Sequence, residues 1–253
     1  MSAVPAHGKA FEEDPRLWLV STPLLDLDDP KLRLKARSLT QLCKTEREKA
    51  LAIFGFVKRI PFSKPMKMRL RTAREVIDAG CGDADDKGTV FVALLRAAGI
   101  PARLRYAELR VDMLRGLVPN MTRASRPVAE IWLGRWVRTD TYIFDAVFMA
   151  AARQRLKDAG WQCGYGIHVA GASLWNGVDD AYLGGESTEE DPMVLRDLGV
   201  YHDPEDLVSS PEWRAEFPRV VRALHWNVVA PAMERVIREL RAEGSRGAVM
   251  RPS

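Results

Sequence analysis

The segment GCGDADDKG, residues 80–88, holds several side chains that could do chemistry. Cys81 lies in a loop between two glycines, and Asp83, Asp85 and Asp86 follow it closely. A thiol whose pKa is lowered by a neighbouring imidazole is a nucleophile for acyl transfer. Several carboxylates within a few ångströms can instead bind a hard cation such as Ca²⁺ or Mg²⁺. Acidic residues also cap helices and interact favourably with the helix dipole, and we favour that simpler explanation here.

A second thiol lies in the segment GWQCGYGIH, residues 160–168, where Cys163 precedes His168 by five residues. If this loop folds back on itself, the spacing would bring a thiol and an imidazole together, although chance also produces such spacings. Cys81, Cys163 and His168 are therefore alternative candidates for a nucleophile and its base. None of them shows the Cys-x-x-Cys or His-x-x-x-His spacing typical of zinc sites, so no metal or cofactor is predicted.

Helices are predicted on the N-terminal side of residues 80–88. The first, from Asp29 to Lys44, has its apolar residues at helical spacing, namely Leu32, Ala36, Leu39 and Leu42. The second begins with a capping-box pattern in which Glu48 follows Thr45 by three residues. A short helix in TAREVIDAG is predicted to end at Gly80.

Asp83 is a suitable N-cap for a buried helix, which Gly99 and Pro101 should end. Its expected apolar face consists of Val90, Phe91, Leu94, Leu95 and Ala98. The alternating segment ARLRYAELR predicts a strand, and PVAEIWL and RWVRTDTY, joined by Gly134, predict a tight hairpin with Asp140 at its end. Helices followed by antiparallel strands indicate an α+β fold in which helices pack on an antiparallel sheet.

These motifs, in this order, resemble the transglutaminase-like superfamily, whose members share the papain-like fold. Members typically carry Cys in G-x-C-x-D-K-A, His in H-A-W-x-E-V and Asp in W-V-x-x-D, and these three residues form a catalytic triad. Three segments of this chain correspond in order to these patterns, and they lie within roughly residues 45–145: GDADDKG, RPVAEIW and WVRTD. The resemblance therefore places Ala84, Arg126 and Asp140 at the three triad positions, and only Asp140 matches.

The two departures remove both partners of the thiol chemistry. Ala84 can neither attack a substrate nor ionise, and an Arg at 126 stays protonated, so it cannot act as a general base. We expect Arg126 and Asp140 to form a charge-assisted pair that closes the former cleft. The alternative, which remains open, is that Arg126 binds a carboxylate or phosphate of a ligand.

The remaining chain, residues 146–253, is predicted to pack on this core as an extension. It begins with a helix that ends at Gly160 and continues with a long loop, residues 161–211, that is rich in aromatics. The loop is either a packed Ω-loop, which we favour, or the wall of a pocket for a small polar ligand. The candidate pocket residues are Asp86, Lys87, Glu130, Trp175 and Tyr182.

A helical pattern from Pro211 to Glu243 forms the C-terminal helical extension, with breaks expected at Pro218 and Pro231. Its apolar residues suggest a face that covers the domain or forms a homodimer, and His225 is expected to be structural. Residues 1–28 are expected to form an N-terminal arm, and residues 29–145 the transglutaminase-like core.

The composition limits the classes of partner. The chain has 253 residues, 47% of them hydrophobic, and 38 basic against 34 acidic residues give a net charge of +4. Because Lys and Arg are not clustered, no nucleic-acid partner is predicted. Three widely spaced cysteines, no leader and no apolar run of about 18 residues suggest a cytoplasmic protein without a membrane span.

Two functions follow from these observations. The first is a transglutaminase-like protein that has lost its nucleophile and base and acts as a binding or assembly module for a protein partner or a small polar ligand. The second is a cysteine-dependent amide hydrolase or acyl transferase with a relocated site at Cys81 or Cys163.

Overall fold

The structure is a computed structural model of the chain, and it describes residues 14–67, 69–117, 124–185, 187, 189–216 and 228–249. Its elements are, in chain order, η1 (Pro15–Leu19), α2 (Pro30–Thr40), α3 (Glu46–Arg59), α4 (Ala73–Ala79), α5 (Ala84–Ala97), β1 (Ala102–Leu109), η2 (Val111–Leu114), β2 (Ala124–Trp132), β3 (Trp136–Thr139), α6 (Ala146–Ala159), β4 (Cys163–Gly164), β5 (Ile167–His168), β6 (Val194–Tyr201), α7 (Pro204–Ser209), α8 (Pro211–Glu216) and α10 (Ala230–Val249).

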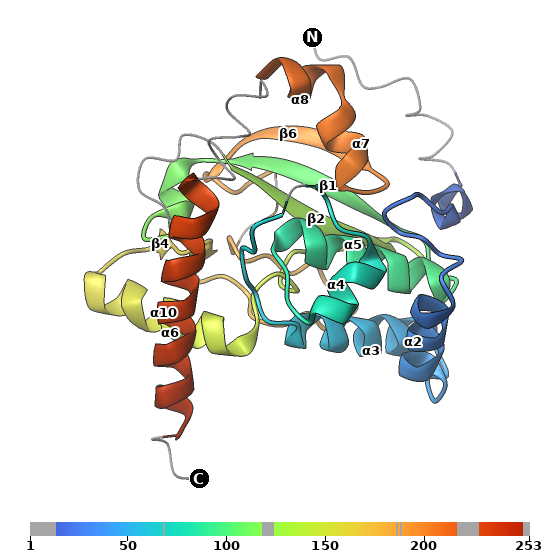
Figure 1. Cartoon of the computed structure of the whole chain (residues 1–253), viewed down its shortest axis with the longest axis horizontal. Helices are drawn as coiled ribbons and strands as arrows, with labels where there is room; N and C mark the ends of the chain where they lie inside the picture. Colours follow the sequence, from blue (N-terminus) through green and yellow to red (C-terminus); the bar gives the residue numbers. More distant parts are fainter. Residues whose placement is uncertain are drawn as a thin grey trace.

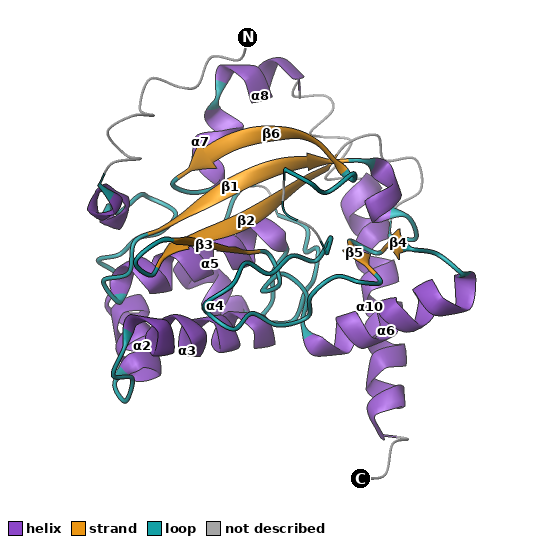
Figure 2. Ribbon diagram, turned by 180° about the vertical axis from the view of Figure 1, so that it is seen from behind, coloured by secondary structure: helices purple, strands orange, loops and turns teal. Residues whose placement is uncertain are grey.

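The α+β fold predicted from the sequence is confirmed. Four antiparallel strands form a sheet in the order β3-β2-β1-β6, and helices α2 to α5 lie together on one side of it (Figure 1). Strands β2 and β3 form the predicted hairpin, in which Gly134 adopts a positive φ of 83°. A second, two-stranded ribbon of β4 and β5 lies apart from the main sheet (Figure 2).

Helix α5 is the centre of the core. Asp83 caps it by accepting a hydrogen bond from the backbone N–H of Asp86, and the Asp86 side chain accepts one from the backbone N–H of Asp83. The sequence predicted a buried helix with one apolar face, and every residue from Asp86 to Arg96 is buried. It contacts helices on one side and the sheet on the other, so no face of it is left for solvent.

The local helix signals are confirmed at most ends. Thr72 and Asp145 cap α4 and α6, and Gly80 and Gly160 end these helices in the left-handed conformation. At α3, Thr45 accepts from the N–H of Glu48 as predicted, but the Glu48 carboxylate accepts from Lys44 instead of from Thr45.

The prediction that Leu42 belongs to the apolar face of the first helix is wrong. Leu42 is 88% exposed, because α2 ends at Thr40 and does not carry Leu42 onto its buried face. Leu32 and Ala36, earlier on the same helix, are buried as expected.

The prediction of a long loop over residues 161–211 is wrong in part, because this segment includes β4, β5 and α7 as well as a longer strand. The longer strand is the edge strand β6, which pairs with β1 through two register shifts. The main sheet therefore crosses the predicted domain boundary at residue 145. Part of the segment is packed, as we favoured, because Trp175 lies in the core with its ring edge-on to Phe54 and Phe91.

The described part of the N-terminal arm is more closely packed than expected, whereas the C-terminal helix packs on the domain as predicted. Trp18 and Leu25, within the predicted N-terminal arm, are buried against the core. Helix α10 packs on α6 and buries Ile237 and Leu240 (Figure 1). Pro231 lies in the first turn of α10, where proline is tolerated, and does not break it. The expectations for Pro218, His225 and residues 1–13 fall outside the described residues.

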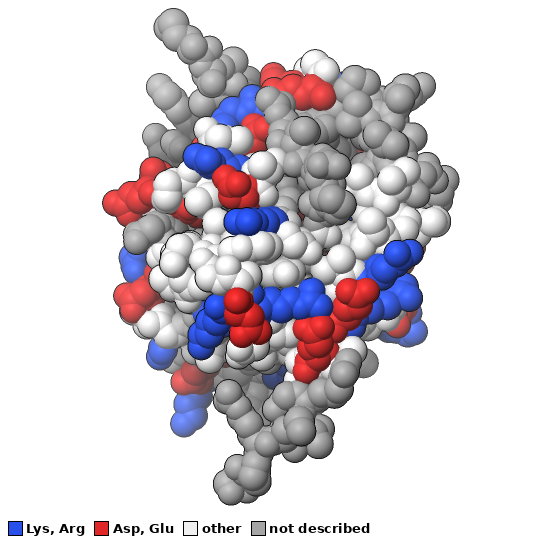
Figure 3. All heavy atoms as spheres, turned by 90° about the vertical axis from the view of Figure 1, so that its left-hand side faces the viewer, with Lys and Arg blue, Asp and Glu red and all other residues white. Residues whose placement is uncertain are grey.

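No helix among the described residues is both long and apolar enough to cross a membrane. On the face shown in Figure 3, Lys and Arg lie interspersed with Asp and Glu, as the sequence predicted.

Candidate functional site

The first position of the family triad lies at the start of α5. Ala84 is the first residue of this helix and is only partly buried. The backbone geometry of a nucleophile at a helix N-terminus is therefore present, but the side chain there is a methyl group. No thiol or hydroxyl stands at the position where thiolate chemistry would begin.

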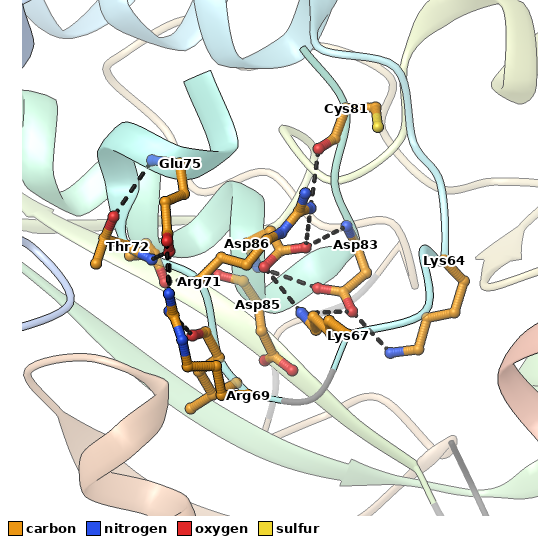
Figure 4. Close-up of polar contacts among 12 residues, drawn as sticks. Lys64, Lys67, Arg69, Arg71, Thr72, Glu75, Cys81, Asp83, Asp85 and Asp86 are labelled. Carbon is orange, nitrogen blue, oxygen red and sulfur yellow. Dashed lines mark hydrogen bonds and ion pairs between the residues drawn. The ribbon is translucent and has the colours of Figure 1, made fainter. Parts of the chain in front are cut away.

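The acidic residues around Ala84 are matched by basic residues from the preceding loop. Lys64 and Lys67 contact the same oxygen of Asp83, at 2.8 and 3.0 Å, and Lys67 and Arg71 each contact Asp86 (Figure 4). Burial opposes ionisation of Asp83, but the two lysines outweigh it and hold its pKa below the usual value. The capping explanation is thus supported, and the described residues contain no cluster of three or more side chains suited to a metal ion.

Asp85 differs from its two neighbours because no basic side chain contacts it among the described residues. Its Oδ1 accepts a hydrogen bond of 3.1 Å from the hydroxyl of Tyr106 on β1. Burial, together with the charge of Asp83, raises the pKa of Asp85 to about 6. This carboxyl group therefore changes its charge close to neutral pH.

The second and third triad positions form a buried ion pair. Arg126 Nε lies 2.9 Å from Asp140 Oδ2, and the two side chains are 5% and 0% exposed. Arg126 Nη2 also donates to Asp191 at 3.3 Å, and Asp140 Oδ1 accepts from the backbone N–H of Leu183 at 2.7 Å. Burial raises the pKa of Asp140, although Arg126 acts in the opposite direction. The expected ion pair of Arg126 and Asp140 is present, but neither Arg126 Nε nor Asp140 Oδ2 has the geometry of a hydrogen bond with any described residue.

Tyr142 occupies the space between α5 and strand β2. Its hydroxyl donates to the carbonyl of Pro127 at 3.0 Å. A Cβ atom at Gly88 would lie 3.1 Å from this hydroxyl oxygen and 3.3 Å from Leu104, which is closer than most such contacts. The departure from the family pattern at Gly88 therefore makes room for Tyr142 and for close packing of α5 on the sheet.

The candidate thiols are free cysteines. Cys163 and His168 are direct partners across the β4–β5 ribbon, as the fold-back hypothesis required. However, burial and the nearby Asp112 raise the pKa of the Cys163 thiol, and His168 Nδ1 accepts a hydrogen bond from the backbone of Ala170. Cys81 precedes α5, and its sulfur points away from the carboxylates (Figure 4).

The candidate pocket residues make separate polar contacts in the structure. Asp86 belongs to the cap of α5, and Lys87 is fully buried with its Nζ donating to the carbonyl of Ile60 at 2.8 Å. Burial lowers the pKa of Lys87 far below its usual value, which favours the neutral amine. Trp175 donates to the carbonyl of Asp179 from inside the core, and the hydroxyl of Tyr182 donates to Asp180.

Glu130 is the centre of a separate ionic cluster. Its fully buried carboxylate is contacted by Arg103, Arg105 and Arg138, at 2.5, 2.7 and 3.0 Å. Arg105 and Arg138 also contact Asp197 and a second carboxylate, Glu189. Because three cations and three anions balance, this cluster is explained as an ionic network that stabilises the sheet.

Sequence reasoning missed Asp191, Lys64 and Lys67 as neighbours of the triad positions. Asp191 lies far from Arg126 in the chain, and no local pattern connects the two residues. The two lysines could have been found, because a pair of cations three residues apart precedes a run of three aspartates.

Comparison with known proteins supports a transglutaminase-like domain within the described fold. Residues 33–141 match the family model of the transglutaminase-like superfamily. A solved structure of a candidate cysteine protease from Cytophaga hutchinsonii is similar at 21% identity and a TM-score of 0.42. The match covers 56% of the present chain and 44% of that protein, less than half its length. No curated protein matches the chain.

Proposed function

We propose that this protein uses its transglutaminase-like domain as a binding or assembly module that has no thiol chemistry. The observation that carries the proposal is the buried ion pair of Arg126 and Asp140, beside a helix that begins with Ala84. A guanidinium that faces two carboxylates stays charged, so it cannot accept the proton that a thiol must lose.

The same pair supports a ligand-binding role for Arg126. Its Nη1 is buried and has no hydrogen-bond acceptor among the described residues. An unsatisfied buried donor costs about 1–3 kcal/mol, so an oxygen from a bound group would stabilise the arrangement. The proposed partners are a protein or a small polar ligand, in a cytoplasmic setting, with neither nucleic acid nor membrane involved. A homodimer through α10 would have to use surface that α6 does not already cover.

Labelling of the native protein with iodoacetamide across pH tests the proposal directly, with each cysteine read separately by mass spectrometry. We expect Cys81 and Cys163 to react only as the pH approaches or exceeds the ordinary thiol pKa of about 8.5. Rapid reaction of either residue below pH 7 would reveal an activated thiol, and the enzyme hypothesis would then replace the binding module.

A nucleophile restored at position 84 should not restore activity by itself. We expect Ala84→Cys to show no catalytic turnover of p-nitrophenyl acetate, because Arg126 provides no base. The double variant Ala84→Cys/Arg126→His is the matched comparison, since it supplies both groups beside Asp140. Turnover by the single variant would contradict the role assigned to Arg126, whereas activity confined to the double variant would support it.

A further inference from the structure

The segment that follows α3 is bonded directly to the start of α5. The backbone N–H of Ser63 donates to the carbonyl of Gly82 at 3.1 Å, and the N–H of Gly82 donates to the carbonyl of Pro61 at 3.2 Å. Phe62 and Gly82 thus form an isolated parallel bridge, one residue before the helix cap at Asp83. Any movement of residues 61–64 would therefore disturb the backbone hydrogen bonds that hold Gly82 next to the start of α5.

Helix α10 holds the same segment at two points. The Glu234 carboxylate accepts from the backbone N–H of Lys64 at 2.6 Å and from the Ser63 hydroxyl at 3.0 Å. Seven residues later, Arg241 pairs with Asp145, whose carboxylate also accepts from the backbone N–H of Phe62. Residues seven apart lie on one face of a helix, so a single face of α10 makes both contacts.

A third contact completes the connection to the altered triad. Lys64, whose backbone is held by Glu234, places its Nζ 2.8 Å from Asp83 Oδ2. Asp83 caps α5 next to Ala84 and is itself only 2% exposed. The structure therefore contains an unbroken series of polar contacts from the C-terminal helix to the start of α5.

We propose that α10 is a regulatory arm that controls the order of residues 61–64 and of the start of α5. When α10 is docked, Glu234 acts as a positioning residue that keeps residues 61–64 against Gly82. A partner that draws α10 away from the domain releases this segment and loosens the helix start. By thermodynamic reciprocity, anything that binds and stabilises the start of α5 must also favour the docked state of α10.

The proposal goes beyond the proposed function, because the coupling holds whatever the domain binds. Amide hydrogen exchange of the full chain tests it through two amides that α10 does not touch, those of Ser63 and Gly82. In Glu234→Ala we expect both to exchange about tenfold faster, the factor that corresponds to about 1.4 kcal/mol for a lost charge-assisted contact. Alkylation of the adjacent Cys81 should accelerate in parallel.

Three comparisons keep the test decisive. Glu239→Ala removes an exposed carboxylate from the same helix and should leave both amides unchanged. Glu234→Gln retains a neutral acceptor and should give an intermediate rate. The amides that pair β1 with β2 report global unfolding and should not change.

Two results would overturn the coupling. In the first, exchange in α10 of Glu234→Ala increases while Ser63 and Gly82 keep their wild-type rates. In the second, all amides, including those of β1 and β2, accelerate together, which would show a loss of global stability without any local control of α5.

Discussion

Removal of the Arg126 guanidinium should destabilise the protein strongly, mainly because buried carboxylates would lose their cation. In Arg126→Leu, the carboxylates of Asp140 and Asp191 lose a cation in a site where Asp140 is fully buried. Breaking a buried ion pair on one side costs about 3–5 kcal/mol, a large part of the roughly 5–15 kcal/mol by which domains are usually stable. We expect a loss of this size in urea unfolding at pH 8, with an unchanged m-value.

The matched variant separates the charge from the packing. In Arg126→Leu/Asp140→Asn, the amide oxygen at position 140 can still accept the N–H of Leu183, and one uncompensated charge is gone. We expect the double variant to recover about 2 kcal/mol of the loss, since an unpaired buried charge costs more than a neutral amide.

The pH dependence of the stability loss in Arg126→Leu gives a second, independent test of the buried pair. Without Arg126, the folded-state pKa of Asp140 must rise further above its unfolded value. A carboxyl group with a raised folded pKa contributes stability that is present at low pH and lost as pH rises through that pKa. The deficit of Arg126→Leu should therefore shrink from pH 8 to pH 5. A deficit below 1 kcal/mol, or one that the Asp140→Asn change does not reduce, would refute the buried pair as the closure of the site.

Two further predictions concern buried groups with shifted pKa values. Burial lowers the pKa of Lys58 to about 8, so this group should add up to about 3 kcal/mol to the free energy of unfolding between pH 8 and pH 10.5, because the unfolded chain holds the extra proton. Since the buried Lys87 acts in the same direction, urea unfolding of Lys58→Met should show a smaller increase than the wild type and still some increase. Equal pH slopes in the variant and the wild type would contradict the shift at Lys58. The pKa of Asp85 is raised to about 6, so lowering the pH from 7 to 5 should stabilise the wild type, whereas Asp85→Asn should be more stable at pH 7 by about 1–2 kcal/mol and show no such gain. A less stable Asp85→Asn variant at pH 7 would show that its bond to Tyr106 outweighs the cost of burial.

Local signals in the sequence were sufficient for most of the helices and for the β2–β3 hairpin. Caps such as Asp83 and Thr72 act on backbone groups within three residues, so their effect can be read from the sequence directly. The strand β6 was missed because its partner β1 lies far away in the chain. Two register shifts and the positive φ of Gly199 also break the alternation by which a strand is recognised.

The site was predictable where the family pattern applied and not beyond it. The pattern placed Arg126 and Asp140 next to each other, and the structure pairs them. It carried no information about Asp191, which reaches Arg126 from a segment outside residues 33–141. It also did not place Trp175 in the core, and the packed loop was favoured only from the aromatic content of the segment.

The late position of β6 in the chain has a consequence during protein synthesis. About 85 residues separate the end of β1 at Leu109 from the start of β6 at Val194. At about 5–20 residues per second, a ribosome needs roughly 4–17 s to make that stretch. Throughout this interval β1 can pair with β2 on one edge, while its other edge offers unpaired backbone groups to any neighbouring chain. The nascent protein thus depends on rapid release of its C-terminal third, or on a chaperone, to avoid aggregation through β1.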